Sequence, residues 1–547
     1  STARRGLYAV GDHGAHSSLV TPLPEVSLVL TVVALAPVLL VLVLMTVLGW
    51  SAARAGLVTA AVTLVLALTV FGFGGEDARV GVAASLAGVL AEAGFIALTV
   101  IGIIGPALGI HYLQRSTGAA ARLRQALAML HPDPRLGAIL VAWFFALFLE
   151  GAAGFGTPVA LAAPFLVAAG MPALPAVAAA LVGHAAGVSF GAIGTPVLAQ
   201  SALVDATGAE LAQSTVVYHL ALGAVPVAVM VVIIGRAYGH FRGLWWWGAL
   251  AAVCFFVPYG LIAWFLGPEL PTLGGALVGV LVFSFVLVRH RRRVHARGES
   301  GVPDEVVTTH PHPDARDVVT ADITVLRAAA PYLVLVGVVL LTRLIGPLRE
   351  ALQSVTLAWE LPGGFSGSVQ PLYHPTMLLT IAFLAGALLQ RASWRRIRVA
   401  FVTATLQLGP VLVALVAMIT IARTMTASGM TEQLALAAAG LGLAWPVFAP
   451  LVGAFGTFIT GSATASNLLF TDLQSSTARA LALPELPLLG AQGFGAAVGN
   501  IIAPHNIVAA VATVGLTGQE GKVLRTTVPT ALAYLVLGGV LALLFVL

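Results

Sequence analysis

The chain of 547 residues is 59% hydrophobic and only 9% charged, with a formal net charge of +5. Soluble globular proteins carry about 25% charged residues, so this composition excludes a soluble domain and indicates an integral membrane protein. The positive charge lies in loop arginines, which orient membrane proteins, and it does not argue for nucleic-acid binding. The single cysteine, Cys254, excludes an internal disulfide.

Apolar runs of about 20 residues, the length that crosses roughly 30 Å of hydrocarbon, recur along the chain and predict an all-α polytopic protein. Residues 1–25 form a polar N-terminal segment without the apolar core of a cleaved signal peptide. In the first half, apolar segments lie near residues 26–49, 52–73, 81–113, 136–170, 173–204 and 214–236. Residues 237–322 form a linker with two helices, near 243–265 and 270–289, and a basic loop. In the second half, apolar segments lie near 323–346, 375–390, 401–425, 433–475, 485–515 and 526–547.

The arginine clusters fix the orientation, because short cytoplasmic loops collect Lys and Arg. When all the richest clusters are placed inside, residues 136–170 must enter and leave on the cytoplasmic side, and residues 433–475 on the outer side. We therefore predict that both segments are re-entrant hairpins. Residues 173–204 and 485–515 contain glycine and proline at their centres and are predicted to be broken helices.

The two halves, residues 26–236 and 323–547, then contain the same order of elements in opposite orientations. This order predicts an inverted repeat with about 12 transmembrane helices and two hairpins. Inverted repeats with broken helices are the architecture of secondary transporters, which hold substrate near the membrane midplane. The linker with its basic cytoplasmic loop joins the two halves.

Four interrupted places should meet at that midplane, and each combines glycine or proline with hydroxyl or amide side chains. Helix N-termini carry about half a positive charge, so a carboxylate is a natural ligand there. The breaks are GAAGFGTPV (151–159), GAIGTPV (191–197), FGTFITGSATASN (455–467) and GNIIAPHN (499–506). The candidate substrate-binding residues in them are Thr157, Thr195, Ser462, Thr464, Ser466, Asn467, Asn500 and Asn506. The alternative is that these small residues only allow close helix packing.

Ionisable residues inside the spans are a second indication of a functional site, because inserting each one at a helix centre costs about 2.5–3.5 kcal/mol. Arg423 suits a carboxylate as a bidentate donor, and the alternative is that it snorkels to the outer headgroups. Glu150, His184 and His505 are the candidate proton-coupling residues, with structural pairing or helix–helix hydrogen bonding as their alternatives. The role of Glu92 is open.

Four long motifs carry a family resemblance across nearly the whole chain. They are FLEGAAGFGTPVALAAPFLVAAG, SFGAIGTPV, GTFITGSATASNLLF and VGNIIAPHNIVAAVATVGLTGQEGKVLR. Together they resemble the L-lactate permease family of bacterial proton-coupled lactate and glycolate symporters. The resemblance implies uptake of a small 2-hydroxymonocarboxylate with a proton across the bacterial inner membrane, with no cofactor or metal. A homo-oligomer is compatible with this reading.

Symport with a proton makes the moving unit neutral and avoids carrying a bare charge through a medium of low dielectric constant. By resemblance to other hairpin transporters, we expect an elevator-type movement of residues 136–204 and 433–515 against the remaining spans. Two classes compete with this reading: a passive anion channel, and a sodium-coupled carboxylate symporter. A membrane-embedded enzyme is disfavoured, because the sequence lacks motifs such as HExxH and GxSxG on an exposed turn.

Overall fold

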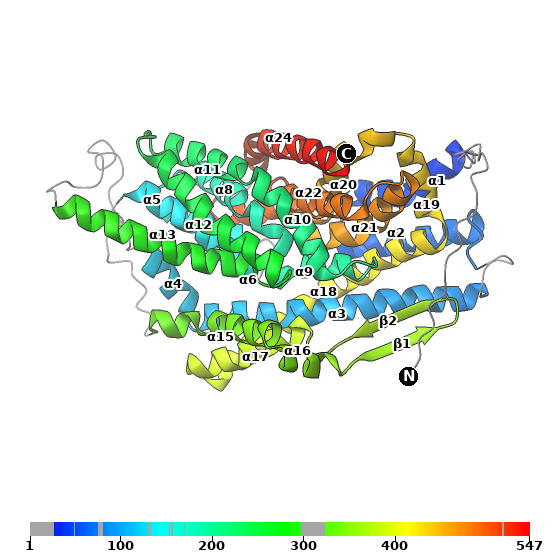
Figure 1. Cartoon of the computed structure of the whole chain (residues 1–547), viewed down its shortest axis with the longest axis horizontal. Coiled ribbons are helices and arrows are strands. Elements are labelled where there is room, and N and C mark those ends of the chain that lie inside the picture. Colours follow the sequence, from blue (N-terminus) through cyan, green and yellow to red (C-terminus); the bar gives the residue numbers. More distant parts are fainter. Residues whose placement is uncertain are drawn as a thin grey trace, which may run out of the picture.

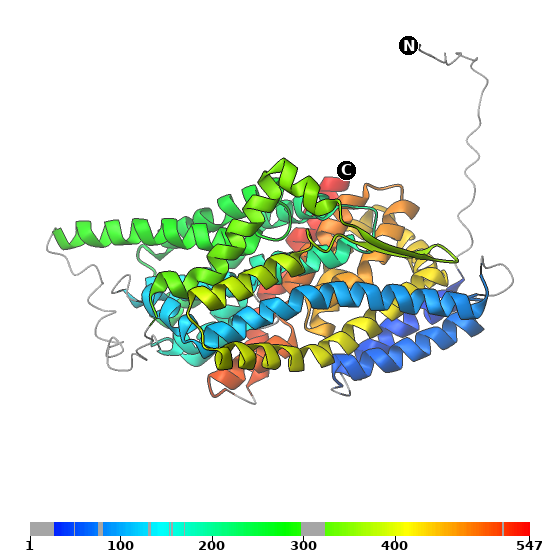
Figure 2. The same ribbon diagram turned by 90° about the horizontal axis from the view of Figure 1, so that it is seen from below.

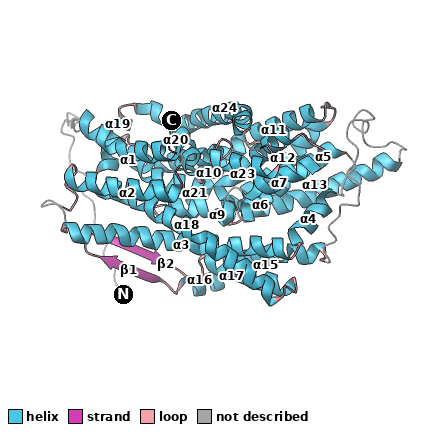
Figure 3. Ribbon diagram, turned by 180° about the vertical axis from the view of Figure 1, so that it is seen from behind, coloured by secondary structure: helices cyan, strands magenta, loops and turns pink. Residues whose placement is uncertain are grey.

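The computed structural model describes residues 27–46, 48, 50–74, 80–128, 133–152, 154, 157–168, 170–296, 323–516 and 519–547. The predicted N-terminal segment 1–25 and most of the predicted basic loop lie outside these residues. Most of the helices run along the longest axis of the molecule, and a two-stranded sheet lies at its edge beside α3 (Figure 1, Figure 3).

In the first half, the hairpin and broken-helix regions are each divided into several short helical pieces. The helices are α1 (Leu28–Thr46), α2 (Ala52–Thr69), α3 (Val82–Ser116), α4 (Ala119–Ala128), α5 (Pro134–Ile139), a π-helical turn (Leu140–Phe145), α6 (Ala146–Ala152), α7 (Thr157–Ala168), α8 (Ala173–His184), a 3-10 turn (Ala185–Phe190), α9 (Gly191–Ser201), α10 (Gly208–Leu222) and α11 (Ala224–Ala237). The linker supplies α12 (Leu244–Phe265) and α13 (Pro271–Ala296).

The second half contains most of the remaining helices and the sheet. Its elements are α15 (Val325–Leu344), α16 (Gly346–Gln353), β1 (Leu357–Leu361), β2 (Phe365–Val369), α17 (Pro375–Leu389), α18 (Trp394–Ala427), α19 (Met430–Ala439), a 3-10 turn (Gly442–Ala444), α20 (Trp445–Thr460), α21 (Ala463–Ala480), α22 (Glu485–Gly499), α23 (Pro504–Thr513) and α24 (Glu520–Val546). Helices α3 (blue) and α18 (yellow) lie side by side along the molecule (Figure 2).

Among the described residues, eight helices are long and apolar enough to cross a membrane, or up to ten if each bent helix pair is one span. The chain is therefore a multi-pass membrane protein. The predicted total of about 12 also includes α1, α2 and α17, whose apolar stretches are shorter.

The structure contains one element that the all-α prediction omits, the antiparallel pair β1–β2, in which Leu357 pairs with Val369 and Leu361 with Phe365. The segment predicted as a hairpin, residues 433–475, covers most of α19, all of α20 and much of α21. Helix α19 is bent by 103° from the next helix, and α20 and α21 are joined at residues 461–462.

Helices α20 and α22 pack with their backbones in direct contact. A Cβ atom on Gly495 would lie 1.9 Å from the Pro450 carbonyl oxygen, and one on Gly499 would lie 2.4 Å from the Ala454 carbonyl oxygen. Such distances are far inside van der Waals contact, so only glycine fits. The second hairpin, α20–α21, and the broken helix α22–α23 are therefore held together through the contact of α20 with α22.

Replacing Gly495 with alanine should lower the thermal stability of the purified protein, because the opposing atom is backbone and cannot rotate away. Overpacking of this kind costs typically about 1–3 kcal/mol. The control is Gly409→Ala in α18, where the added methyl meets no atom within 4 Å. A melting temperature for Gly495→Ala equal to that of the unmodified protein would contradict this packing.

Candidate binding site

The structure brings all four predicted chain breaks together around one small cavity. The first hairpin contributes its tip, α8–α9 and α22–α23 contribute their breaks, and the second hairpin contributes the start of α21. The lining residues are Glu150, Gly154, Val188, Gly191, Ala192, Pro196, Gly461, Ser462, Ala463, Thr464 and Asn500.

The start of α21 presents open backbone donors to this cavity. Ser462 caps the helix, and its hydroxyl oxygen accepts from the Ala465 N–H at 3.3 Å. The first intrahelical bond runs from the Ser466 N–H to the Ser462 carbonyl at 3.0 Å. The N–H groups of Ala463 and Thr464 therefore precede the bonded ladder. Both residues are buried, and both line the cavity. This arrangement suits a carboxylate.

The broken helix α8–α9 contains a left-handed turn of three residues at the start of α9. Ala192, Ile193 and Gly194 have φ angles of 43°, 58° and 74°. Glycine adopts this region freely, whereas alanine and a β-branched isoleucine do so only under strain. The Thr195 hydroxyl donates to the Ala192 carbonyl and closes the turn. The strained turn holds Gly191, Ala192 and Pro196 at the cavity wall.

A chain of buried polar groups leads away from the cavity, starting at Glu150. One carboxylate oxygen of Glu150 lies 3.9 Å from His184 Nε2, and both side chains are almost fully buried. His184 Nε2 also lies 3.2 Å from Asn500 Oδ1, and its Nδ1 lies 2.8 Å from the Ala180 carbonyl oxygen. Asn506 Nδ2 donates to the same Asn500 Oδ1 at 2.6 Å.

The hydrogen-bond partners of His184 depend on its protonation state and on the orientation of the neighbouring amides. A neutral imidazole carries one N–H, yet both ring nitrogens here face oxygen acceptors. Asn500 Oδ1 already accepts from Asn506, so it is an acceptor toward His184 as well. With the amides in this orientation the pattern fits an imidazolium, and with the Asn500 and Asn506 amides turned over it fits a neutral imidazole. Glu150 lines the cavity, and His184 lies 3.9 Å from it.

Three predicted residues lie next to the cavity and form hydrogen bonds to other parts of the protein. The Asn467 amide donates to the Pro196 carbonyl at 3.0 Å and links the second hairpin to α9. The Ser466 hydroxyl donates to the Gly453 carbonyl at 2.7 Å and joins the two hairpin arms. The Thr195 hydroxyl donates to the Ala192 carbonyl within the left-handed turn. These bonds give Thr195 and Ser466 a positioning role, whereas the buried Oδ1 of Asn467 has no hydrogen-bond partner among the described residues.

The remaining predicted residues fall into two groups. Thr157 begins α7 and His505 lies in the first turn of α23, but their side chains are outside the described part of the structure. Arg423 is not among the residues that line the cavity. Its Nε lies 3.2 Å from Glu92 Oε2 and its Nη1 lies 3.8 Å from Asp472 Oδ2. The pairing accounts for its position inside a span.

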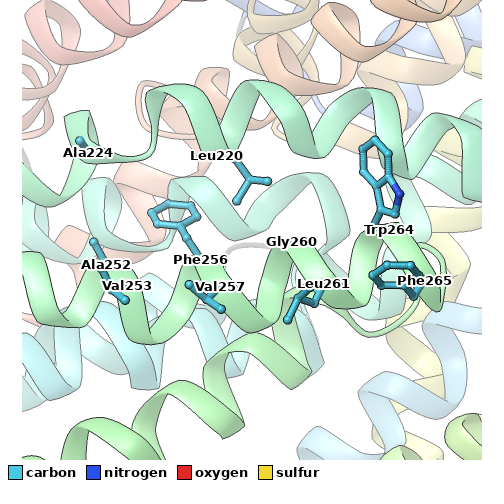
Figure 4. A pocket seen from close by; sticks show the side chains of 10 residues that line it. All are labelled: Leu220, Ala224, Ala252, Val253, Phe256, Val257, Gly260, Leu261, Trp264 and Phe265. Atoms are coloured by element: carbon cyan, nitrogen blue, oxygen red, sulfur yellow. The ribbon is translucent and has the colours of Figure 1, made fainter.

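A larger hollow lies between the α10–α11 bend and α12 (Figure 4). Its walls include Leu220, Phe256, Leu261 and Trp264, and no ionisable side chain is among its lining residues. In a membrane protein such an apolar surface faces lipid tails. It offers no partner for a carboxylate, so the smaller cavity is the candidate site.

Comparison with known proteins identifies the family. A family model described as L-lactate permease matches residues 30–547. This chain belongs to the L-lactate permease family. The chain is 27% identical to an L-lactate permease of Bacillus subtilis, with 94% of this chain and 96% of that protein covered. It is 30% identical to one of Escherichia coli over 80% and 83%. It is 26% identical to the glycolate permease GlcA of Escherichia coli over 94% and 95%.

In this L-lactate permease family member, sequence reasoning missed two polar features of α21. Asp472 lies within the second arm of the hairpin and pairs with Arg423. Gln474 donates to Gln492 at 3.2 Å and accepts from the Trp445 indole at 3.0 Å, which ties both hairpin arms to α22. The sequence signal for these two features is a carboxylate and an amide, Asp472 and Gln474, inside a predicted membrane segment. It was obscured because the stretch TDLQSSTAR has the polarity of a loop.

Proposed function

We propose that this protein is a secondary active transporter that moves L-lactate and related small 2-hydroxymonocarboxylates such as glycolate together with protons. The L-lactate permeases and the glycolate permease among its relatives support this substrate class. The observation that carries the proposal is one cavity lined both by the N-terminus of α21 and by Glu150, which lies 3.9 Å from His184. One wall of this cavity suits an anion, and the other holds a titratable group.

In the proposed binding mode, the substrate carboxylate accepts hydrogen bonds from the Ala463 and Thr464 N–H groups. The Thr464 and Ser462 hydroxyls and the Asn500 amide serve the 2-hydroxyl group. Ser462 can donate because its oxygen, but not its hydrogen, is used by the helix cap. Thr157 and His505 belong to the same convergence of breaks and are kept as candidates. A proton on the Glu150–His184 pair would offset the charge of the anion.

The proposed mechanism uses an inverted repeat. The helices α1, α2 and α3 correspond to α15, α17 and α18, the hairpin α5–α7 to α20–α21, and the broken helix α8–α9 to α22–α23. We propose that the hairpins and broken helices move as an elevator against α1–α3 and α15–α18, in the inner membrane of a bacterium. Close packing of α20 against α22 supports movement of the second hairpin with its broken helix as one body.

Flux into proteoliposomes with separately imposed gradients tests this function. An inward proton gradient without sodium should concentrate labelled L-lactate inside, and a protonophore should abolish the accumulation. Lactate accumulation driven only by a sodium gradient at equal pH would replace proton coupling with sodium coupling. Equilibration without accumulation under either gradient would indicate a passive channel.

A further inference from the structure

Outside the cavity, three charged side chains meet between α3, α18 and α21. Arg423 lies 3.2 Å from Glu92 and 3.8 Å from Asp472, and the side chains are 20%, 12% and 10% exposed. Two carboxylates facing one guanidinium leave one negative charge in excess when both are ionised. Excess charge is costly within membrane-spanning helices. The cluster is therefore suited to bind a proton.

The two carboxylates have different surroundings. Glu92 lies closer to Arg423, and its other oxygen accepts from the Ser366 backbone N–H at 3.1 Å. Asp472 has the longer ion pair, and its Oδ2 lies 2.8 Å from the Thr426 hydroxyl. Of the two carboxylates, Asp472 is therefore the one held less closely by Arg423.

The Thr426 hydroxyl can serve Asp472 in either protonation state. Its oxygen lies 2.8 Å from Asp472 Oδ2 and 3.0 Å from the Ala422 carbonyl oxygen. When Asp472 is ionised, Thr426 donates to it. When Asp472 is protonated, its O–H donates to Thr426, and Thr426 donates to Ala422 instead. The proton is gained without loss of a hydrogen bond, whereas the attraction to Arg423 is lost.

The other charges around Asp472 are few. Arg479 on α21 and Glu485 at the start of α22 act on it with opposite signs. Glu432 lies on the neighbouring α19, and α9 and α20 contain no ionisable residue. Arg479 is bonded to Ser475 at 2.8 Å on its own helix. Arg423 is therefore the charge that links α21 to α18.

We propose that Asp472 is a second protonatable residue of the transport cycle, and that its protonation releases the second hairpin from α18. The proton comes from water, forms the Asp472 O–H bond and returns to water when the ion pair forms again. Arg423 keeps Glu92 as its partner throughout, so no guanidinium is left unpaired. This inference rests on the proposed proton-coupled transport, and it assigns Asp472 a positioning role away from the substrate.

Lactate exchange at equal pH and equal lactate concentration on both sides of proteoliposomes tests the inference across a pH series. Asp472→Asn imitates the protonated state, so the ratio of its exchange rate to that of the unmodified protein should rise with pH. At the alkaline end we expect a gain of about fivefold, the order expected for losing one partly exposed ion pair. Asp472→Glu should restore the original pH profile.

Glu92→Gln supplies a variant with the opposite expected effect. It leaves Arg423 with Asp472 alone, so the hairpin is held more tightly and exchange should slow. Asp205→Asn, at an exposed carboxylate, is the control for loss of charge. A constant Asp472→Asn ratio at all pH values, or equal slowing by Asp472→Asn and Glu92→Gln, would overturn the inference. Absence of lactate exchange in the unmodified protein would instead overturn the proposed function.

Discussion

Replacing Glu150 with glutamine is expected to abolish the concentration of lactate by a proton gradient, leaving only equilibration. The amide has the size of the carboxyl group, which matters because the site is tight: a Cβ atom on Gly191 would lie 2.2 Å from Glu150 Oε1. The substitution removes the acidic partner of His184, so the pair no longer gains and loses a proton beside the cavity. The anion-binding N-terminus of α21 is unchanged.

Exchange of labelled for unlabelled lactate should therefore continue in Glu150→Gln at equal pH, while uptake against a gradient is lost. Both are measured in the same proteoliposomes, with Asp205→Asn as the control for removal of an exposed carboxylate. If Glu150→Gln still concentrates lactate with an unaltered pH dependence, Glu150 has a structural role only. Loss of exchange as well would place the side chain in direct contact with substrate.

Replacing Ser462 with leucine should abolish both uptake and exchange. Ser462 lines a small cavity, and the branched isobutyl group of leucine, with two more heavy atoms than the serine side chain, would occupy the space before the Ala463 and Thr464 N–H groups. The substitution also removes the helix cap, which costs typically about 1 kcal/mol of stability. The loss of transport is expected to be complete because the cavity is blocked.

Ser462→Ala separates the steric effect from the loss of the cap. Alanine also removes the capping hydroxyl but leaves the cavity open, so it should lower the melting temperature to a similar degree. It should retain exchange with a weaker affinity for lactate, because the proposed bond from the Ser462 hydroxyl to the 2-hydroxyl group is lost. Exchange rates and thermal melting of both purified variants provide the comparison. Normal lactate exchange by Ser462→Leu would move the substrate site away from the start of α21.

The four breaks could be predicted from the sequence because their composition is chemically unusual for a membrane span. Non-helical backbone at membrane depth has to line a cavity or be buried in protein, so glycine and proline beside hydroxyls mark such places. The partners of Arg423 could not be predicted in the same way. Glu92 and Asp472 reach it only through the packing of three helices that are distant in sequence.

The sheet and the strained turn show two different limits of sequence reasoning. The stretch LAWELPGGFSGSV, residues 357–369, contains a hairpin signal in its sequence, the dipeptide Gly363–Gly364. Both glycines have positive φ in the structure. It was obscured by its place between two membrane spans. At Ala192 and Ile193 there is no local signal, because neither residue favours a left-handed backbone. Only the surrounding fold imposes that conformation.

The left-handed turn determines the order in which the protein should lose binding and fold on heating. A left-handed conformation costs roughly 1–2 kcal/mol at each non-glycine residue, so residues 192 and 193 would return to a right-handed helix if their surroundings loosened. Those surroundings include Gly187 against Thr272 and Gly194 against the Pro268 carbonyl. Damage to this packing would straighten the chain at the cavity wall while leaving the long helices intact. Binding would then be lost at a lower temperature than the fold, and a protein with full helical content could already be inactive.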